Sequence, residues 1–445
     1  MSGPSEVQRL LAIINQAATD ALSEYATHGE DVPSIYEAKS HPLDLSDAAF
    51  NLKKIIRTLE GACHQLCATL APPLHTVLNN GQDYSWACLR VAASKGITEI
   101  LDDHPDGVHI DELSLKVGIT KGKLATIMRT LVARHCYQEV SKDVYANNRL
   151  SLTLRSQTPG TAFLDLQTQE GQQAAFYLQK SLDDPVYGPA TDLQHTAFTY
   201  SVKDTGFSGT LYEWIREHKD RLQVMIKGMV GMNQLMGTLS VLEVFPWGKY
   251  KTICDVGSGS GSFTWSLVQK FPAIEVTMFD LPETISVAEK AAADQKNRVD
   301  RVKFSSGNFF EGSPPDGLDV YYLRNIIHNW PDNSALSILQ SVQKAMRKDS
   351  RVLVHDYILP SYHDPEGDNP AHALDKAPPP MLPDFGYGNM RLHNQNLTML
   401  FMYNSRERTV AELTGLSQAA GLKLSRVWDL GETAVFELVR SDSSE

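Results

Sequence analysis

A glycine-rich turn between two apolar runs constrains this chain more than any other feature. Residues 253–256 form a short apolar run that suits a buried strand, and a G-x-G-x-G sequence begins directly after it at Gly257. Residues 263–271 then carry apolar side chains at helical spacing, and a second apolar run, 274–279, ends in Asp280. The order strand, glycine turn, helix, strand and carboxylate predicts half of a doubly wound nucleotide-binding fold.

The residues around this turn favour some ligands over others. Asp280 ends the second predicted strand, where its carboxylate can accept hydrogen bonds from both hydroxyls of a ribose. A dinucleotide site uses G-x-G-x-x-G, so that a pyrophosphate rests on the N-terminus of the helix. Here Asp255 precedes the first glycine by two residues, and its carboxylate would repel a pyrophosphate but can hold a cationic amino acid group. A glycine turn without any ligand is the remaining interpretation.

Composition indicates the class of protein. At 445 residues the chain has room for two domains, and 21 % charged and 42 % hydrophobic residues are ordinary for a globular protein. The net charge of -12 argues against general binding to nucleic acid or acidic membranes. The sequence has no apolar run of transmembrane length, and its first residues lack the basic and apolar regions of a signal peptide. It has five cysteines, an odd number. We expect a cytoplasmic protein with free thiols, in which Cys63 and Cys67 are buried small residues rather than metal ligands.

The first 80 residues are predicted to form a helical extension. Residues 5–28 and 47–71 carry apolar side chains at helical spacing, and the polar stretch 29–45, with two prolines, connects them. Helices of this kind can pack on a second copy of the chain or form an extra layer within one copy. We divide the rest of the chain at residue 165, into a domain over 81–165 and a catalytic domain over 166–445.

Residues 84–152 have the pattern of a winged helix-turn-helix. A first helix is followed by a short helix over 109–118 that ends at a glycine, a second helix over 121–133, and a hairpin over 137–146. Alone, this pattern suggests a DNA-binding regulator. The second helix has few basic residues, however, and the acidic residues around it disfavour contact with phosphates. We therefore expect a structural or dimerising role.

Four methionines recur at helical spacing shortly before the glycine turn, at positions 225, 229, 232 and 236. Such a stripe is more often part of a core, but flexible thioethers can also line an apolar substrate site. The candidates for a substrate pocket are Phe198, Met225, Met229, Met232 and Asn404.

After Asp280, strands and helices continue to alternate. Strands are predicted over 302–304, 318–323, 351–357, 424–430 and 434–439, and helices over 285–293, 334–346 and 410–420. This order predicts a mostly parallel sheet with helices on both faces, as in a Rossmann-like α/β fold. The proline-rich stretch 360–391 interrupts the alternation and is interpreted as a lid or an interface loop.

A histidine follows the predicted strand 318–323, in the sequence L-R-N-I-I-H-N-W-P-D. His328 is thus predicted at the carboxyl edge of the sheet, where ligands of doubly wound folds bind. A neutral imidazole there can take a proton from a hydroxyl group that attacks an electrophilic carbon. Asp356, at the end of a later strand, and Glu407 could orient the ring. Spacing alone leaves open whether His328 is such a base or a structural histidine.

Five motifs, in this order, resemble the caffeic-acid-type O-methyltransferases of fungal secondary metabolism. They are D-V-G-S-G-S-G from Asp255, F-D-L-P from Phe279, L-R-N-I-I-H-N-W-P-D from Leu323, H-D-Y-I-L-P from His355 and R-E-R-T from Arg406. The resemblance covers roughly residues 85–440. It implies a winged-helix dimerisation domain followed by a Rossmann-like, class I catalytic domain that uses S-adenosylmethionine.

The resemblance also implies roles for individual residues. His328 matches the general base of the family, and Asp356 and Glu407 match the carboxylates that position it. The residues implied in cofactor binding are Asp255, Gly257, Gly259, Asp280, Leu281, Asn308, Phe309 and Arg324.

The chain departs from the family pattern at four of its motif positions. Asn308 and Phe309 match the pair around the adenine, where the family usually has Asp in place of Asn308. Arg324 matches a basic cofactor contact that is often Lys, Asp356 stands where Glu is frequent, and Asn329 stands where Asp is common. The amide oxygen of Asn308 can still accept a hydrogen bond from the adenine amino group. Asp356 is shorter than Glu by one methylene and is expected to hold His328 less closely.

The predicted activity is transfer of a methyl group from S-adenosylmethionine to a phenolic or enolic oxygen of an apolar, aromatic metabolite, with His328 as base and no metal. We expect a homodimer that binds neither nucleic acid nor a membrane. One alternative is a pericyclase that uses the positive charge of the cofactor without consuming it, with Arg324 and Asn325 polarising a substrate carbonyl. Another is a non-catalytic, cofactor-binding regulator.

Overall fold

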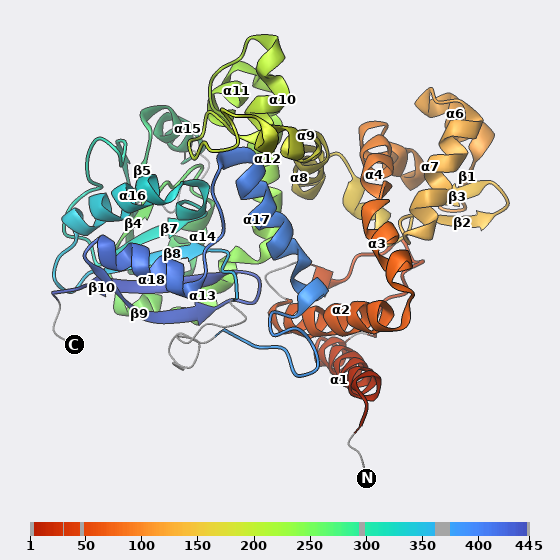
Figure 1. The fold of residues 1–445 in the computed structure, drawn as a ribbon, viewed down its shortest axis with the longest axis horizontal. Helices are drawn as coiled ribbons and strands as arrows, with labels where there is room; N and C mark the ends of the chain where they lie inside the picture. The colour runs from red at the N-terminus through yellow and green to blue at the C-terminus, as the bar shows by residue number, and fades with distance from the viewer. Residues whose placement is uncertain (1–3, 30, 45–48, 293–298, 361–373, 443–445) are drawn as a thin grey trace. The chain divides into compact units, whose positions relative to one another are not determined.

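The computed structural model describes residues 4–29, 31–44, 49–292, 299–360 and 374–442 (Figure 1). The chain forms two compact units, one of residues 1–177 and 212–237, the other of residues 178–211 and 238–445. The predicted domain boundaries at residues 80 and 165 stay a prediction. Within the described ranges, no helix combines the length and the apolar character that crossing a membrane requires.

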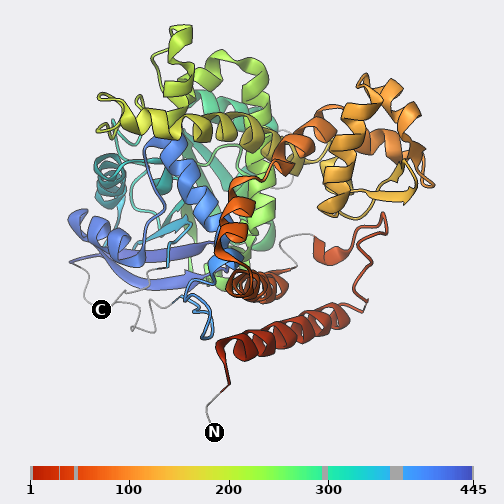
Figure 2. The same ribbon diagram turned by 45° about the vertical axis from the view of Figure 1, so that its right-hand side comes forward.

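The first unit is mainly helical, and its helix α1 packs along α2 (Figures 1 and 2). Its helices are α1 (Glu6–Thr27), α2 (Phe50–Leu70), α3 (Pro73–Gly81), α4 (Ser85–Ser94), α5 (Ile97–Asp102), α6 (Ile110–Val117), α7 (Lys121–Ala133), α8 (Pro159–Leu166) and α12 (Lys219–Met236). Its strands are β1 (Val108–His109), β2 (Gln138–Ser141) and β3 (Val144–Ala146). Helices α9 (Gln172–Asp183) and α11 (Leu211–Glu217) each contain a boundary between the units.

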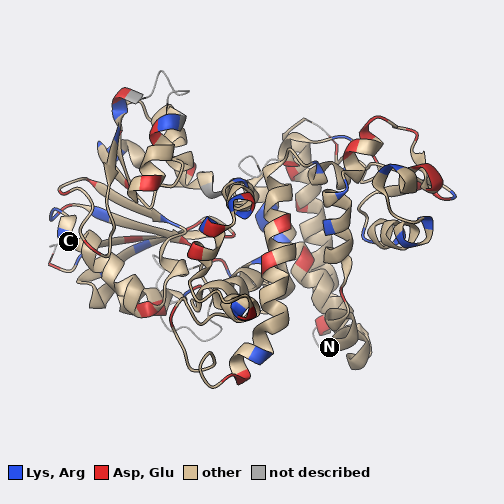
Figure 3. Cartoon of the chain, turned by 90° about the horizontal axis from the view of Figure 1, so that it is seen from above, with Lys and Arg blue, Asp and Glu red and all other residues tan. Residues whose placement is uncertain are grey.

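The predicted winged helix is present in the first unit. Strands β1, β3 and β2 form an antiparallel sheet in that order, and α6 ends at Gly118, which has φ +69°. Lys121 of α7 pairs with Asp111 at 2.7 Å, and Arg129 pairs with Asp143 at 2.9 Å. Figure 3 shows Lys and Arg interspersed with Asp and Glu along the chain. Because carboxylates already neutralise these two cations of α7, the helix is poorly suited to binding phosphates.

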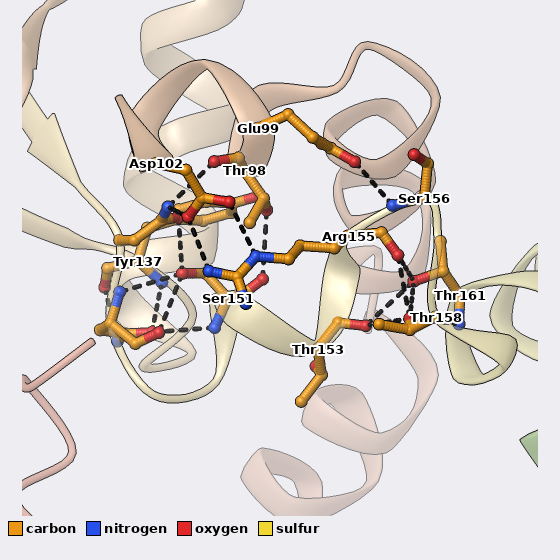
Figure 4. Close-up of polar contacts among 12 residues, drawn as sticks. Thr98, Glu99, Asp102, Tyr137, Ser151, Thr153, Arg155, Ser156, Thr158 and Thr161 are labelled. Atoms are coloured by element: carbon orange, nitrogen blue, oxygen red, sulfur yellow. Dashed lines mark hydrogen bonds and ion pairs between the residues drawn. The ribbon is translucent and has the colours of Figure 1, made fainter. Parts of the chain in front are cut away.

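Polar contacts tie α5 to the segment that leads from the hairpin into α8 (Figure 4). Asp102 accepts two hydrogen bonds from the guanidinium of Arg155, at 2.7 and 2.9 Å. Glu99 accepts one from the backbone N–H of Ser156 at 2.6 Å. Bonds from a planar guanidinium to a carboxylate are directional, so they set the path of the chain as well as stabilising it.

Helix α12 packs closely against α8 because two of its residues have no side chain. A Cβ atom on Gly231 would lie 2.3 Å from the carbonyl oxygen of Pro159, and one on Gly228 would lie 2.7 Å from Cδ1 of Leu166. At the start of α12, Arg221 donates two hydrogen bonds of 2.6 Å to the two oxygens of the buried Glu170 carboxylate. Arg221 also donates a hydrogen bond of 2.7 Å to Asp165 of α8. Close backbone packing and these ion pairs therefore hold α12 against α8 and against the turn that follows it.

The expectation that Cys63 and Cys67 are buried is wrong. Both side chains are exposed on α2. The last buried residue of this helix is Ala62; residues 64–66 are half-buried, and positions 63 and 67 are exposed. Helical spacing identifies which residues share a face, but it does not show which face the neighbouring elements cover.

The second unit contains a seven-stranded sheet in the order β6-β5-β4-β7-β8-β10-β9 (Figure 1). Its strands are β4 (Thr252–Val256), β5 (Glu275–Asp280), β6 (Val302–Ser306), β7 (Val320–Arg324), β8 (Arg351–Asp356), β9 (Leu422–Asp429) and β10 (Ala434–Arg440). Its helices are α10 (Ala197–Val202), α13 (Val241–Val244), α14 (Ser262–Lys270), α15 (Pro282–Ala292), α16 (Asp332–Ala345), α17 (Met390–Tyr403) and α18 (Val410–Ala419). The predicted Rossmann-like fold is confirmed.

The sheet is parallel except at β10, which runs antiparallel to both β8 and β9. Only residues 430–433 separate β9 from β10, and a connection this short forms a hairpin, which is necessarily antiparallel. On one face of the sheet, Val256, Leu323 and Val354 pack in a single buried cluster with residues of α16 and α18. The carboxyl ends of β4, β5, β7 and β8 therefore meet at one edge.

The stretch 360–391, which we interpret as a lid or an interface loop, falls partly outside the described residues, because these exclude 361–373. The described part includes a short 3-10 turn, Gly386–Asn389, directly before α17. The lid or interface role stays a prediction.

The α8–α12 contact predicts the effect of one added methyl group. Gly231→Ala should lower the free energy of unfolding by about 1–3 kcal/mol, because the new Cβ has to displace backbone atoms of α8. Gly122→Ala in α7 is the control, because its Cβ would meet no atom within 4 Å. Urea unfolding measures both variants. Equal stability of Gly231→Ala and the wild type would contradict the close packing.

Candidate functional site

The glycine turn has a backbone conformation that residues with side chains rarely adopt. Gly257, Gly259 and Gly261 have φ angles of +71°, +55° and +81°, a region that side chains disfavour. A Cβ on Gly257 would lie 2.4 Å from Cδ1 of Ile326, whereas one on Gly259 would meet no atom within 4 Å. The first glycine thus permits close packing, and the second leaves open space on the turn.

The polar groups around the turn fit a ligand that carries hydroxyl or amino groups. One carboxylate oxygen of Asp280 accepts a hydrogen bond from the N–H of Gly259 at 2.9 Å, and the other accepts one from the N–H of Leu281 at 2.7 Å. The hydroxyl of Ser258 is buried and has no hydrogen-bond partner within the described part of the chain. A buried hydroxyl without a partner costs stability, so a bound ligand or an ordered water molecule would stabilise it here. Sequence reasoning did not single out Ser258.

Asp255 and Arg324 lie near this turn at the carboxyl ends of β4 and β7. The buried carboxylate of Asp255 accepts a hydrogen bond of 2.6 Å from the hydroxyl of Thr264 in α14. Burial raises the pKa of Asp255 to about 6, although the Thr264 hydrogen bond and the charge of Arg324 oppose the rise. Arg324 donates a hydrogen bond of 2.8 Å to the hydroxyl of Ser262 at the start of α14. The first turn of α14 therefore holds both charged side chains.

Aromatic rings gather around the loop after β6. The ring centroids of Phe309 and Phe310 are 4.8 Å apart, and those of Phe310 and Trp330 are 4.7 Å apart. Asn308 accepts a hydrogen bond from the N–H of Phe310 at 3.0 Å and donates one to Glu311 at 3.1 Å. Sequence reasoning did not assign Phe310 and Trp330 to the site, although Phe310 directly follows Phe309 and Trp330 lies two residues after His328. Such rings offer a surface on which a planar base can stack.

His328 lies in a 3-10 turn, Ile327–Asn329, after β7 and is buried. Its Nδ1 is 2.8 Å from Oε1 of Glu407. An ionised carboxylate only accepts hydrogen bonds, so Nδ1 carries the proton and, in the neutral ring, Nε2 is the acceptor. The ring of Tyr357 lies nearly parallel to the imidazole, with an interplanar angle of 13° and centroids 6.1 Å apart.

Asp356 contacts His328 differently from Glu407. Its Oδ2 accepts a hydrogen bond from the backbone N–H of His328 at 3.1 Å, and its buried Oδ1 has no partner among the described residues. The short side chain therefore reaches the backbone of the turn, and the contact to the ring comes from Glu407.

The charges around His328 favour its protonated form. Burial alone would lower the pKa of His328, but the negative charges of Glu407 and Asp356 outweigh this effect and raise the pKa to about 9. Burial raises the pKa of Asp356 and of Glu407, and the positive charge of His328 offsets part of the rise.

His355 provides a contrast in the same sheet. It is also buried, but its two ring nitrogens contact hydroxyls: Tyr322 at 2.6 Å and Thr433 at 2.9 Å. Burial, assisted by the charge of Arg324, lowers the pKa of His355 to about 3. His355 is thus a neutral, structural histidine.

The candidate pocket residues lie in both units. Met225, Met229 and Met232 lie on α12 of the first unit, where Met232 is buried and the other two are half-buried. Phe198 and Asn404 belong to the second unit, and the ring of Phe198 is completely buried. The amide of Asn404 donates hydrogen bonds to the carbonyls of residues 192 and 195, at 2.9 and 2.8 Å. The pocket role of these five residues stays a prediction.

Comparison with known proteins identifies the family. A profile described as an O-methyltransferase domain matches residues 182–423. The chain is 36 % identical over 440 residues to 3-O-methyltransferase 2 of Phanerochaete chrysosporium, with 96 % of each chain covered. The chain belongs to the O-methyltransferase family. This confirms the resemblance to the caffeic-acid-type enzymes, and the protein is an O-methyltransferase.

Solved structures agree with the fold of this O-methyltransferase. The structure of LepI in complex with SAM matches with a TM-score of 0.70 and 20 % identity, covering 96 % of this chain and 99 % of that one. A structure described as a pericyclic reaction enzyme matches with a TM-score of 0.69 and 19 % identity over the same shares. Identities this low establish the fold and nothing finer.

The surroundings of His328 in this O-methyltransferase predict its titration. His328 should remain protonated up to about pH 9. Glu407→Gln should lower its pKa, because the variant removes the nearest negative charge. Because the folded pKa lies above the unfolded value of about 6.5, the resulting stabilisation is fully present below pH 6.5 and is lost as the pH rises through 9. NMR of histidine-labelled protein, assigned with His328→Ala, measures the pKa. A value near 6.5 in the wild type would contradict the role of Glu407.

Proposed function

We propose that this O-methyltransferase transfers the methyl group of S-adenosylmethionine to a phenolic or enolic oxygen of an aromatic metabolite, with His328 as the general base. The observation that carries the proposal is the 2.8 Å contact between Nδ1 of His328 and Glu407. This contact holds one nitrogen of a buried imidazole and leaves the other as the acceptor. A base held this way can take a proton without reorienting.

The glycine turn and its surroundings support the choice of cofactor. S-adenosylmethionine, when bound, supplies an electrophilic methyl group on a positively charged sulfur. The residues that would hold it are Asp280 for the ribose, Ser258 and Gly259 on the turn, and Asp255 near its cationic amino acid end. The aromatic cluster of Phe309, Phe310 and Trp330 suits the adenine.

The basicity of His328 supports a phenolic substrate. A pKa of about 9 is close to that of a phenol, which is about 10 in tyrosine. Proton transfer between groups of similar pKa is nearly balanced in free energy, and Glu407 stabilises the imidazolium that results. Only neutral His328 can accept the proton, so we expect the rate to rise with pH up to about 9.

A pericyclic reaction is the second candidate function. Arg324 and Asn325 adjoin each other at the end of β7, and Asn325 has a φ of +54°, a strained conformation for a residue with a side chain. A guanidinium beside an amide could polarise a substrate carbonyl. A solved structure with a similar fold is described as a pericyclic reaction enzyme, so this chemistry should be tested in parallel with methyl transfer.

We also propose that two copies of the chain form a dimer. No residue of α3 is buried, and Leu74, Val77 and Leu78 on one side of it are 67 %, 66 % and 49 % exposed. Adjacent exposed apolar side chains of this kind mark interaction surfaces.

Substitution of His328 tests the proposed activity. His328→Ala should lower kcat by about 10²–10⁴-fold, because it removes the general base, and should leave the affinity for S-adenosylmethionine nearly unchanged. Methyl-labelled cofactor and a panel of phenols measure the transfer through the label in the product and the S-adenosylhomocysteine released. Calorimetry measures cofactor binding.

His393→Ala is the matched control for this experiment. It removes another imidazole–carboxylate contact of the second unit, to Asp384 at 3.0 Å, and should leave kcat unchanged. Full turnover by His328→Ala would contradict the assignment of the base. A product of unchanged mass, formed without S-adenosylhomocysteine, would favour the pericyclase.

The dimer has its own test. Sedimentation velocity of the wild type should give the mass of two chains, and Leu74→Glu with Val77→Glu should shift it toward one chain, because charges on α3 oppose its burial. Leu115→Glu on α6, where the Leu115 side chain is 83 % exposed, is the control. A monomeric wild type would contradict the dimer.

A further inference from the structure

The segment Ser405–Arg408 holds the turn that carries His328 through its backbone as well as through its ring. The hydroxyl of Ser405 donates a hydrogen bond of 2.6 Å to the carbonyl of His328. Arg408 donates one of 3.0 Å to the carbonyl of Ile327 and one of 2.8 Å to the carbonyl of Trp330. With the contact from Glu407, this one segment contacts the turn at three carbonyls and one ring nitrogen.

The side chain of Arg408 is buried and hydrogen-bonded at this position. Its side chain is only 4 % exposed, and it also bonds to Asp332 through Nε at 3.1 Å and Nη2 at 2.8 Å. The planar guanidinium can reach two backbone carbonyls and a carboxylate at once because its donors point in fixed directions. A lysine carries the same charge but only one nitrogen, so it cannot make the same set of bonds.

The Ser405–Arg408 segment is itself fixed to its surroundings. The carbonyl of Arg408 accepts a hydrogen bond from the N–H of Leu359, in the chain that follows β8, at 3.1 Å. The N–H of Glu407 donates to the side chain of Asn396 in α17 at 2.9 Å. Through this segment, the turn is therefore held against the end of β8 and against α17.

We propose that Arg408 is a positioning residue that holds His328 and Trp330 in their working orientations at the same time. Its two backbone bonds flank His328, at Ile327 on one side and at Trp330 on the other. Trp330 belongs to the aromatic cluster proposed for the adenine. Arg408 thereby links the base to the cofactor end of the site. This inference rests on the proposed function for its effect on the reaction.

Arg408→Lys tests this role, because it keeps the charge and removes the forked geometry. The variant should stay folded, lose about tenfold to a hundredfold in kcat, and bind S-adenosylmethionine several-fold more weakly, because a displacement of the order of 1 Å is enough for such losses. The ¹⁵N chemical shift of Nδ1 of His328 should also change, since it reports the hydrogen bond to Glu407.

Arg406→Ala is the matched control. Arg406 pairs with the same Asp332 at 2.9 Å and with Glu412 at 3.4 Å, but its side chain is half exposed, and within the described chain its bonds reach only these two carboxylates. This variant should leave kcat, cofactor affinity and the Nδ1 shift unchanged. Thermal unfolding of each variant and titration of its cofactor sites give the folded fraction, to which kcat is normalised.

Two outcomes would overturn the proposal. One is a folded Arg408→Lys with wild-type kcat, cofactor affinity and Nδ1 shift. The other is failure of Arg408→Lys to fold, which would make Arg408 a stability residue. Failure of the proposed function is distinguishable, because it would appear as full turnover by His328→Ala, while the calorimetric and NMR effects of Arg408→Lys would persist.

Discussion

The contact between the imidazole of His328 and the carboxylate of Glu407 joins two segments that lie 79 residues apart in the chain. It forms only if β7 ends beside the segment that follows α17. Both side chains are buried, so loss of either partner would leave an uncompensated polar group in the interior. The same turn also forms hydrogen bonds with Asp356, Ser405 and Arg408. These bonds hold the buried pair in place, because a small displacement of the turn would break the contact between His328 and Glu407.

Groups that are costly for stability gather at one edge of the sheet. Asp255 is a buried carboxylate whose pKa is raised to about 6 by burial, and Ser258 has a buried hydroxyl without a partner in the described chain. The glycine turn adds backbone conformations that only glycine adopts easily. A folded protein tolerates such costs where a ligand or a reaction offsets them. Their concentration beside His328 is an argument for function that does not depend on similarity to other proteins.

Much of the second unit follows from local patterns. Apolar runs and helical spacing located each strand from β4 to β10, because these elements are buried enough for their periodicity to show. Strand β10 is antiparallel because its connection to β9 is short. The apolar pattern within each strand does not show the direction of the strand. The exposure of Cys63 and Cys67 on α2 could not be foreseen, since it depends on which side of the helix the neighbouring elements cover.

The sequence by itself determined the order of strands and helices, the glycine turn and the placement of His328 at the edge of the sheet, because these depend on residues close together in the chain. Only the tertiary structure decided which buried histidine carries a charge. His328 and His355 both lie at that edge, yet one meets carboxylates and the other meets hydroxyls, and their pKa values move in opposite directions. The pKa depends on the charges and hydrogen-bond partners within a few ångströms, and the bonded neighbours of these two histidines come from parts of the chain 28 to 79 residues away.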